Sequence, residues 1–70
     1  MGGFIRIIDI KQRSMLVNAK RIVKILEGTL EDSGETVCAI YVTDRHSAER
    51  IVVRLGIDQV HQLIIEARNK

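Results

Sequence analysis

Side chains able to take part in catalysis are few in this chain and lie far apart in the sequence. Nucleophilic catalysis needs a Ser, Cys or Thr beside a histidine that is itself held in place. The chain has one cysteine, Cys38, and two histidines, His46 and His61. Cys38 lies inside an apolar run, where a free cysteine usually behaves as a small hydrophobe. We expect a structural Cys38 and two surface histidines, so a hydrolase that pairs a histidine with Asp44 is the least supported class.

Phosphate and metal chemistry have no better support. The chain contains neither G-x-G-x-x-G nor a Walker-type Gly-Lys-Thr. Its one group of carboxylates, Glu31, Asp32 and Glu35, lies in a polar stretch that predicts a flexible turn, a poor support for an acid and base pair. The cysteine and histidine spacing resembles no zinc site, and no calcium loop is present. We therefore predict that the protein is not an enzyme and binds no metal and no cofactor.

Basic side chains indicate a binding function instead. Residues 27–35 hold four acidic residues and no Lys or Arg, so the rest of the chain has eleven basic residues against five acidic ones. The candidate phosphate contacts are Lys20, Arg21, Lys24, Arg50 and Arg54. Recognition of single strands also needs aromatic stacking platforms, and the only aromatic residues are Phe4 and Tyr41. Contact with duplex phosphates therefore stays open, and the competing interpretation is a solvated face of mixed charge.

The length of 70 residues leaves room for one small domain, residues 1–70, with a single hydrophobic core. Hydrophobic residues make up 46% of the chain and charged residues 29%, the balance of a folded globular protein. Because so small a core is marginal and a lone cysteine forms no intrachain disulfide, we expect a homo-oligomer. No uncharged run reaches the roughly 18 to 20 residues of a membrane span, so we expect a cytoplasmic protein. Residues 1–3 are expected to be a disordered N-terminus.

Short runs rich in Val and Ile predict about five strands, because β-branched side chains fit a pleated surface. The expected strands are residues 4–10, 15–17, 22–29, 36–43 and 49–55. The polar turn around Gly34 joins the third strand to the fourth as a hairpin. Two segments leave an alternative open. Ile22, Ile25 and Leu26 also fit a helical stripe, and residues 47–56 keep helical spacing as well.

The end of the chain predicts a helix that starts at Asp58, whose side chain can cap the free amides. Val60, Leu63, Ile64 and Ala67 follow at helical spacing and form one apolar stripe. The expected fold class is therefore α+β: a small, mainly antiparallel β-sheet of about five short strands with one C-terminal amphipathic helix.

The expected strand at residues 36–43 is apolar on both of its faces. Alternate side chains of a strand point to opposite faces of the sheet. One face carries Val37, Ala39 and Tyr41, and the other carries Cys38, Ile40 and Val42. One helix covers only one face, and monomers rarely leave a large apolar patch in water. We therefore expect one of these two sets to form an interface with a second copy or with another protein.

A wider pattern resembles two known families. The stretch from Leu16 to Glu27 is followed by the turn at Gly34, a strand over Val37–Val42, a further strand and a closing helix over Val60–Ala67. This order resembles the short FlbD-type flagellar and swarming motility proteins, although the first strand and the longer loop at residues 44–48 depart from their pattern. The core also resembles LytTR DNA-binding domains, which are longer. Both resemblances lie in hydrophobic spacing and assign no role to a residue of this chain.

These observations predict a small regulatory or adaptor module that acts by protein–protein binding and self-association. The alternative is a nucleic-acid-binding regulator that contacts phosphates through the basic residues named above. The two predictions differ in the partner and agree that binding, and no chemical step, is the activity.

Overall fold

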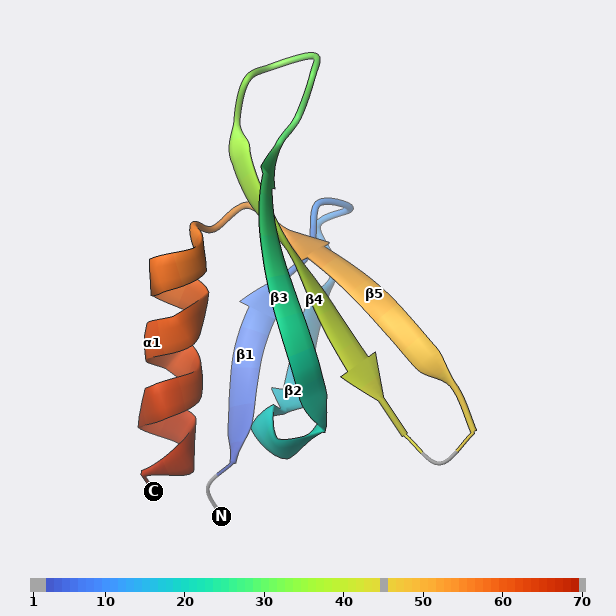
Figure 1. Cartoon of the computed structure of the whole chain (residues 1–70), viewed down its shortest axis with the longest axis vertical. Coiled ribbons are helices and arrows are strands. Elements are labelled where there is room, and N and C mark those ends of the chain that lie inside the picture. The colour runs from blue at the N-terminus through green and yellow to red at the C-terminus, as the bar shows by residue number, and fades with distance from the viewer. Residues whose placement is uncertain (1–2, 45, 70) are drawn as a thin grey trace.

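The computed structural model describes residues 3–44 and 46–69. In this part of the chain the strands come first and an α-helix comes last (Figure 1). The elements are β1 (Phe4–Ile8), β2 (Ser14–Asn18), the 3-10 turn η1 (Ala19–Arg21), β3 (Ile22–Thr29), β4 (Thr36–Thr43), β5 (Ala48–Val53) and α1 (Ile57–Arg68). The predicted order of elements and the predicted fold class, a small α+β domain with a C-terminal helix, are confirmed.

Both segments with an open alternative are strands. Residues 22–29 form β3 after the single turn of η1, in which the Asn18 side chain accepts a hydrogen bond from the Lys20 amide at 3.0 Å. The segment around Ile51 forms β5 and no helix. Ile51 and Val53 are buried while Arg50 and Arg54 are exposed, which is the alternation of a strand with one covered face.

The strands divide into two antiparallel sheets, whereas the sequence suggested one. β1 pairs with β2, and β4 lies between β3 and β5 in a second sheet. An isolated bridge between Asp9 and Val53 joins the two sheets, supported by a 3.0 Å hydrogen bond from the Ile10 amide to the Val52 carbonyl. The hairpin β1–β2 can therefore fold over the larger sheet instead of extending it.

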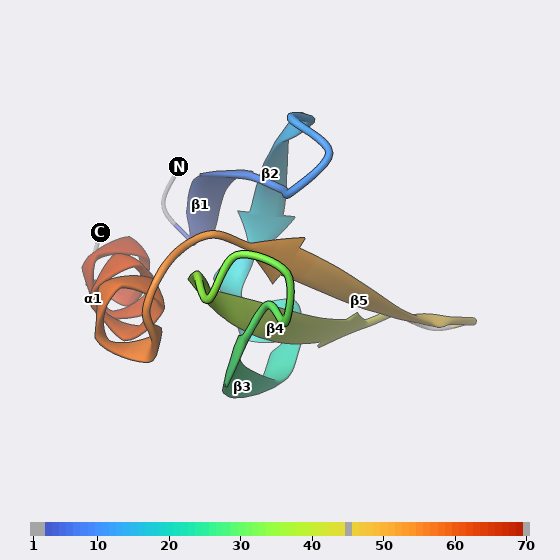
Figure 2. The same ribbon diagram turned by 90° about the horizontal axis from the view of Figure 1, so that it is seen from above.

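The hairpin β1–β2 and α1 together cover one face of the sheet β3–β4–β5 (Figure 2). The core between them consists of fully buried or nearly buried side chains: Ile5, Ile7, Val17, Ala19, Cys38, Ile40, Ile51, Val53, Val60 and Ala67. The expectation that the helix alone covers this face is thus wrong. The inward side of β1, Ile5 and Ile7, supplies much of the cover because a hairpin with one apolar face needs the same burial as a helix stripe.

The helix begins at Ile57, with Gly56 as the preceding residue, so Asp58 lies in its first turn and is not the cap. The Gln59 side chain accepts a hydrogen bond from the Gly56 amide at 2.8 Å. A carboxylate oxygen of Glu27 in β3 accepts one from the Ile57 amide, also at 2.8 Å. A negative group at a helix N-terminus is favourable, and here it comes from thirty residues earlier in the chain. No helix in residues 3–44 and 46–69 has the length and apolar content to cross a bilayer.

The start of the described chain is tied to the rest of the fold. The Gly3 amide donates to the Ala67 carbonyl at 3.0 Å, and the Gly3 carbonyl accepts from the Ala19 amide at 2.7 Å. Gly3 thus links α1 to η1, although it was expected within a disordered N-terminus. The other two residues of that expectation, residues 1 and 2, lie outside the described residues.

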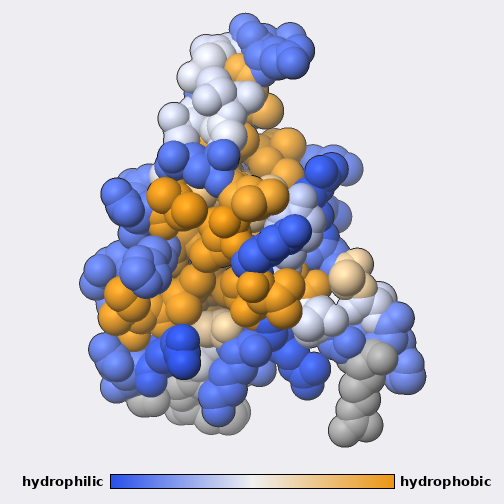
Figure 3. All heavy atoms as spheres, in the orientation of Figure 1, coloured by the Kyte–Doolittle hydropathy of each residue, from blue (hydrophilic) through white to orange (hydrophobic). Residues whose placement is uncertain are grey.

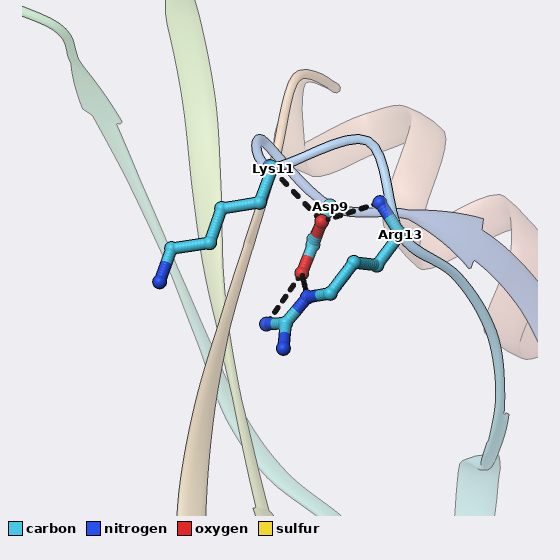
Figure 4. Close-up of polar contacts among 3 residues, drawn as sticks. All are labelled: Asp9, Lys11 and Arg13. Carbon is cyan, nitrogen blue, oxygen red and sulfur yellow. Dashed lines mark hydrogen bonds and ion pairs between the residues drawn. The ribbon is translucent and has the colours of Figure 1, made fainter.

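Asp9 organises the turn between β1 and β2 (Figure 4). Its carboxylate accepts hydrogen bonds from the Lys11 amide at 3.0 Å, the Arg13 amide at 2.9 Å and the Arg13 Nε at 2.7 Å. The Arg13 guanidinium also forms an ion pair with it at 2.7 Å, and only 4% of the Asp9 side chain is exposed. The hydrogen bond from the Arg13 amide, with the other contacts from Arg13 and Lys11, lowers the pKa of Asp9 against the opposing effect of burial.

Candidate interaction surface

Among residues 3–44 and 46–69, the hairpin β1–β2 and α1 lie on one face of the sheet β3–β4–β5, and no further helix or hairpin lies over the second face. Residues directly opposite each other in neighbouring strands share a face, so the register gives two rows on this side. One row is Leu26, Ala39 and Val52, and the next is Lys24, Tyr41 and Arg50. We call these six residues the open face.

The apolar row of the open face is partly in water. Leu26 keeps 50% of its surface exposed, and Ala39 and Val52 are half-buried. Val23 is close to Leu26 in the chain, at the irregularity between β3 and β4, and is 64% exposed. Figure 3 shows apolar atoms gathered over α1 and β3, with hydrophilic atoms around them, so this apolar surface includes the helix side of the sheet. Apolar side chains exposed next to one another on a sheet face mark an interaction site in many soluble proteins.

The second row places two cations on either side of an aromatic ring. Lys24 and Arg50 are each the direct partner of Tyr41 in the ladder. The Lys24 Nζ lies 4.8 Å from the centre of the Tyr41 ring, which is within the range of a cation–π contact. One end of the open face is therefore basic, and its middle is apolar.

The structure separates the two predicted interface sets. Cys38 and Ile40 are fully buried in the core, and Val42 is half-buried against it. Ala39 and Tyr41 lie on the open face. Val37 is on the same side but is buried and lies outside the main core cluster. An external partner can thus reach Ala39 and Tyr41, whereas Cys38 and Ile40 already pack against the hairpin β1–β2.

The five candidate phosphate contacts lie in different places. Only Lys24 and Arg50 share the open face. Arg54 follows β5 and forms a 3.6 Å ion pair with Glu35. Lys20 and Arg21 are exposed in η1. Arg45, another base of this region, lies outside the described residues.

Arg21 also has acidic neighbours that its position in the sequence does not reveal. It lines an open groove of about 350 Å³ together with Asp44 and Glu49. The pKa of Asp44 is lowered mainly because its carboxylate accepts hydrogen bonds from the backbone amides of His46 and Ser47, both at 2.8 Å. The positive charge of Arg21 lowers this pKa further. The charge of Arg21 is therefore partly offset within its own chain.

Cys38 and the two histidines lie on three different parts of the fold. His46 and His61 are exposed, on the loop after β4 and on α1. Burial raises the pKa of the Cys38 thiol, and the negative charge of Glu27 raises it further. Among residues 3–44 and 46–69, no three His, Cys, Asp or Glu side chains come close enough together to hold a metal ion.

Two residues of the open face, Leu26 and Val52, were not among the predicted interface residues. Their signal was available in the sequence, since Leu26 alternates with the partly buried Ile25 and Val52 with the buried Ile51 along their strands. The register with β4 was needed to recognise it. Comparison with protein-family models, with curated proteins and with solved structures finds no match. The FlbD-type and LytTR resemblances stay predictions.

Proposed function

We propose that this protein is a small regulatory or adaptor module that has no catalytic activity and acts by binding another protein and by self-association through the open face. The observation that supports it is the unequal burial of one sheet: Cys38 and Ile40 are fully covered, while Leu26 on the opposite face is half exposed. A partner that covers this face removes apolar surface from water, which is the main favourable term in protein association.

The contribution of Leu26 can be stated in advance. Burying a whole leucine side chain contributes about 1.5 to 3 kcal/mol, and half of this one is exposed. In a two-fold dimer each copy contributes once, so the two leucines together contribute about 1.5 to 3 kcal/mol. Loss of this term weakens a dimer roughly tenfold to a hundredfold.

Sedimentation velocity over a concentration series tests the proposal with two matched variants. Leu26→Asp removes the apolar contact of the open face, and we expect its dissociation constant to rise at least tenfold over the unchanged protein. Leu16→Asp is the control, because Leu16 is also a strand leucine, is 61% exposed and lies on the outer side of the hairpin β1–β2. The proposal of self-association fails if the unchanged protein stays monomeric at high micromolar concentration. It also fails if Leu16→Asp, and not Leu26→Asp, separates the copies.

Contact with nucleic acid is the second candidate, and the observation that favours it is the row of Lys24, Tyr41 and Arg50 on one accessible face. A salt titration of duplex DNA binding tests it. If Lys24 and Arg50 each contact a phosphate, the double variant to alanine should reduce the slope of affinity against salt concentration by about 2. Absence of binding at low salt removes this candidate.

A further inference from the structure

We infer that the partner of the open face is a second copy of this chain, packed face to face with its strands running in the opposite direction, so that the basic row of each copy meets the acidic hairpin tip of the other. This inference rests on the proposed self-association and adds to it an orientation and a set of charge contacts.

The charge of the sheet changes sign from one end to the other. Lys24 and Arg50 form the basic row at one end. The β3–β4 hairpin projects at the other end (Figure 1), and its turn carries Glu31 and Asp32, both exposed. Neither acidic residue forms an ion pair within residues 3–44 and 46–69, whereas Glu35 beside them is paired with Arg54. Lys24 lies five residues before the end of β3 at Thr29, about 16 Å of strand, and the turn with Glu31 follows two residues later.

In two-fold stacking on this face the axis lies in the plane between the sheets, and its direction in that plane decides how the strands of the two copies run. The two aligned arrangements have the axis along the strands or across them. An axis along the strands places the basic row over the basic row and the acidic tip over the acidic tip. An axis across the strands reverses the strand direction and places the basic row of each copy over the acidic tip of the other. Like charges in an interface disfavour the first arrangement and opposite charges favour the second.

The apolar middle of the face is consistent with the reversed arrangement. An axis that crosses β3 near Glu27 places Leu26 of one copy opposite Gly28 of the other, on the same side of the strand. Leu26 is half exposed, and a side-chain carbon added at Gly28 would meet nothing within 4 Å. The projecting leucine thus faces a position with no side chain, which is the shape match that close packing between two sheets requires.

Charge reversal tests this orientation. In the variant Lys24→Glu/Arg50→Glu both ends of the face are acidic, and we expect the dissociation constant to rise on the order of tenfold to a hundredfold, since four ion pairs become four like-charge contacts. Adding Glu31→Lys/Asp32→Lys to the same chain restores complementary ends and should restore the original affinity. Far-ultraviolet circular dichroism checks that each variant is folded.

The arrangement with parallel strands gives the opposite results. Lys24→Glu/Arg50→Glu would then leave the affinity unchanged, and the four-site variant would associate with the unchanged protein in preference to itself. Either result overturns the inference while self-association stands, whereas a wild type that does not associate refutes the proposed function itself. Gly28→Val is an independent check: we expect a folded monomer and at least tenfold weaker association, and unaltered association would contradict the contact of Leu26 with Gly28.

Discussion

Replacing Val53 or its neighbour Val52 by alanine compares the two faces of one strand. Both residues lie in β5, so the two changes have the same chemistry and the same loss of strand propensity. Val53 is fully buried in the core, whereas Val52 is half-buried on the open face. Any difference between the two variants in the free energy of unfolding therefore measures how much more completely Val53 is buried than Val52.

The expected loss in the free energy of unfolding follows from the two methyl groups that each change removes. At about 0.8 kcal/mol for each buried carbon, Val53→Ala loses about 1.6 kcal/mol of transfer free energy, and the cavity left behind raises the loss to about 2 to 3 kcal/mol. Val52→Ala should lose less than about 1 kcal/mol in the monomer. A chain of 70 residues has a total stability of roughly 4 to 10 kcal/mol. The loss at Val53 is thus a large share of the whole.

Urea denaturation followed by circular dichroism measures both values, at a protein concentration low enough to keep the chain monomeric. We expect the urea midpoint to fall clearly for Val53→Ala and little for Val52→Ala. The difference between the two variants should become smaller at high protein concentration, where a partner covers Val52. Equal losses at low concentration would refute the assignment of a covered and an open face.

Three further predictions concern groups that the fold holds in place. Asp9 has a pKa below its ordinary value of 3.8, so its ionised form stabilises the fold fully above about pH 4. This contribution is lost as the pH falls through the lower pKa of the folded chain. The variant Asp9→Asn should therefore be less stable at pH 7, and its stability in urea titrations should depend less on acid pH; an unchanged dependence would contradict the role of Asp9. Cys38 is fully buried with a raised pKa, so a thiol reagent should label the native protein only at the rate of unfolding, and rapid labelling without denaturant would show that the hairpin does not cover it. Glu27→Ala removes the acceptor for the Ile57 amide at the start of α1 and should lower the free energy of unfolding by about 1 kcal/mol, a loss that an unaltered urea midpoint would disprove.

Much of the fold could be predicted because local patterns determine it. β-branched alternation located the strands, and the helical spacing of Val60 and Ala67 placed both in the core. The polar turn at Gly34, which has a φ of +73°, joined β3 to β4 as expected. These features depend on residues that are close together in the sequence.

Contacts between distant segments could not be predicted in this way. The cap of α1 comes from Glu27, thirty residues before Ile57, and Asp58 looked like the better candidate by its position alone. The folding of β1–β2 over the larger sheet brings Asp9 beside Val53, 44 residues further along the chain. The same limit applies to the basic residues. The ion pair of Arg54 with Glu35, which distinguishes Arg54 from Lys24 and Arg50, is visible only in the folded structure.

The most direct test of the central claim, that the uncovered face of the sheet is the contact surface, is a dilution series of methyl NMR spectra with Ile, Leu and Val labelled. We predict that the methyl signals of Leu26 and Val52 shift with protein concentration. Those of Leu16 and Ile8, exposed on the outer side of the hairpin β1–β2, should stay constant. Shifts confined to Leu16 and Ile8, with Leu26 and Val52 unchanged, would contradict the account.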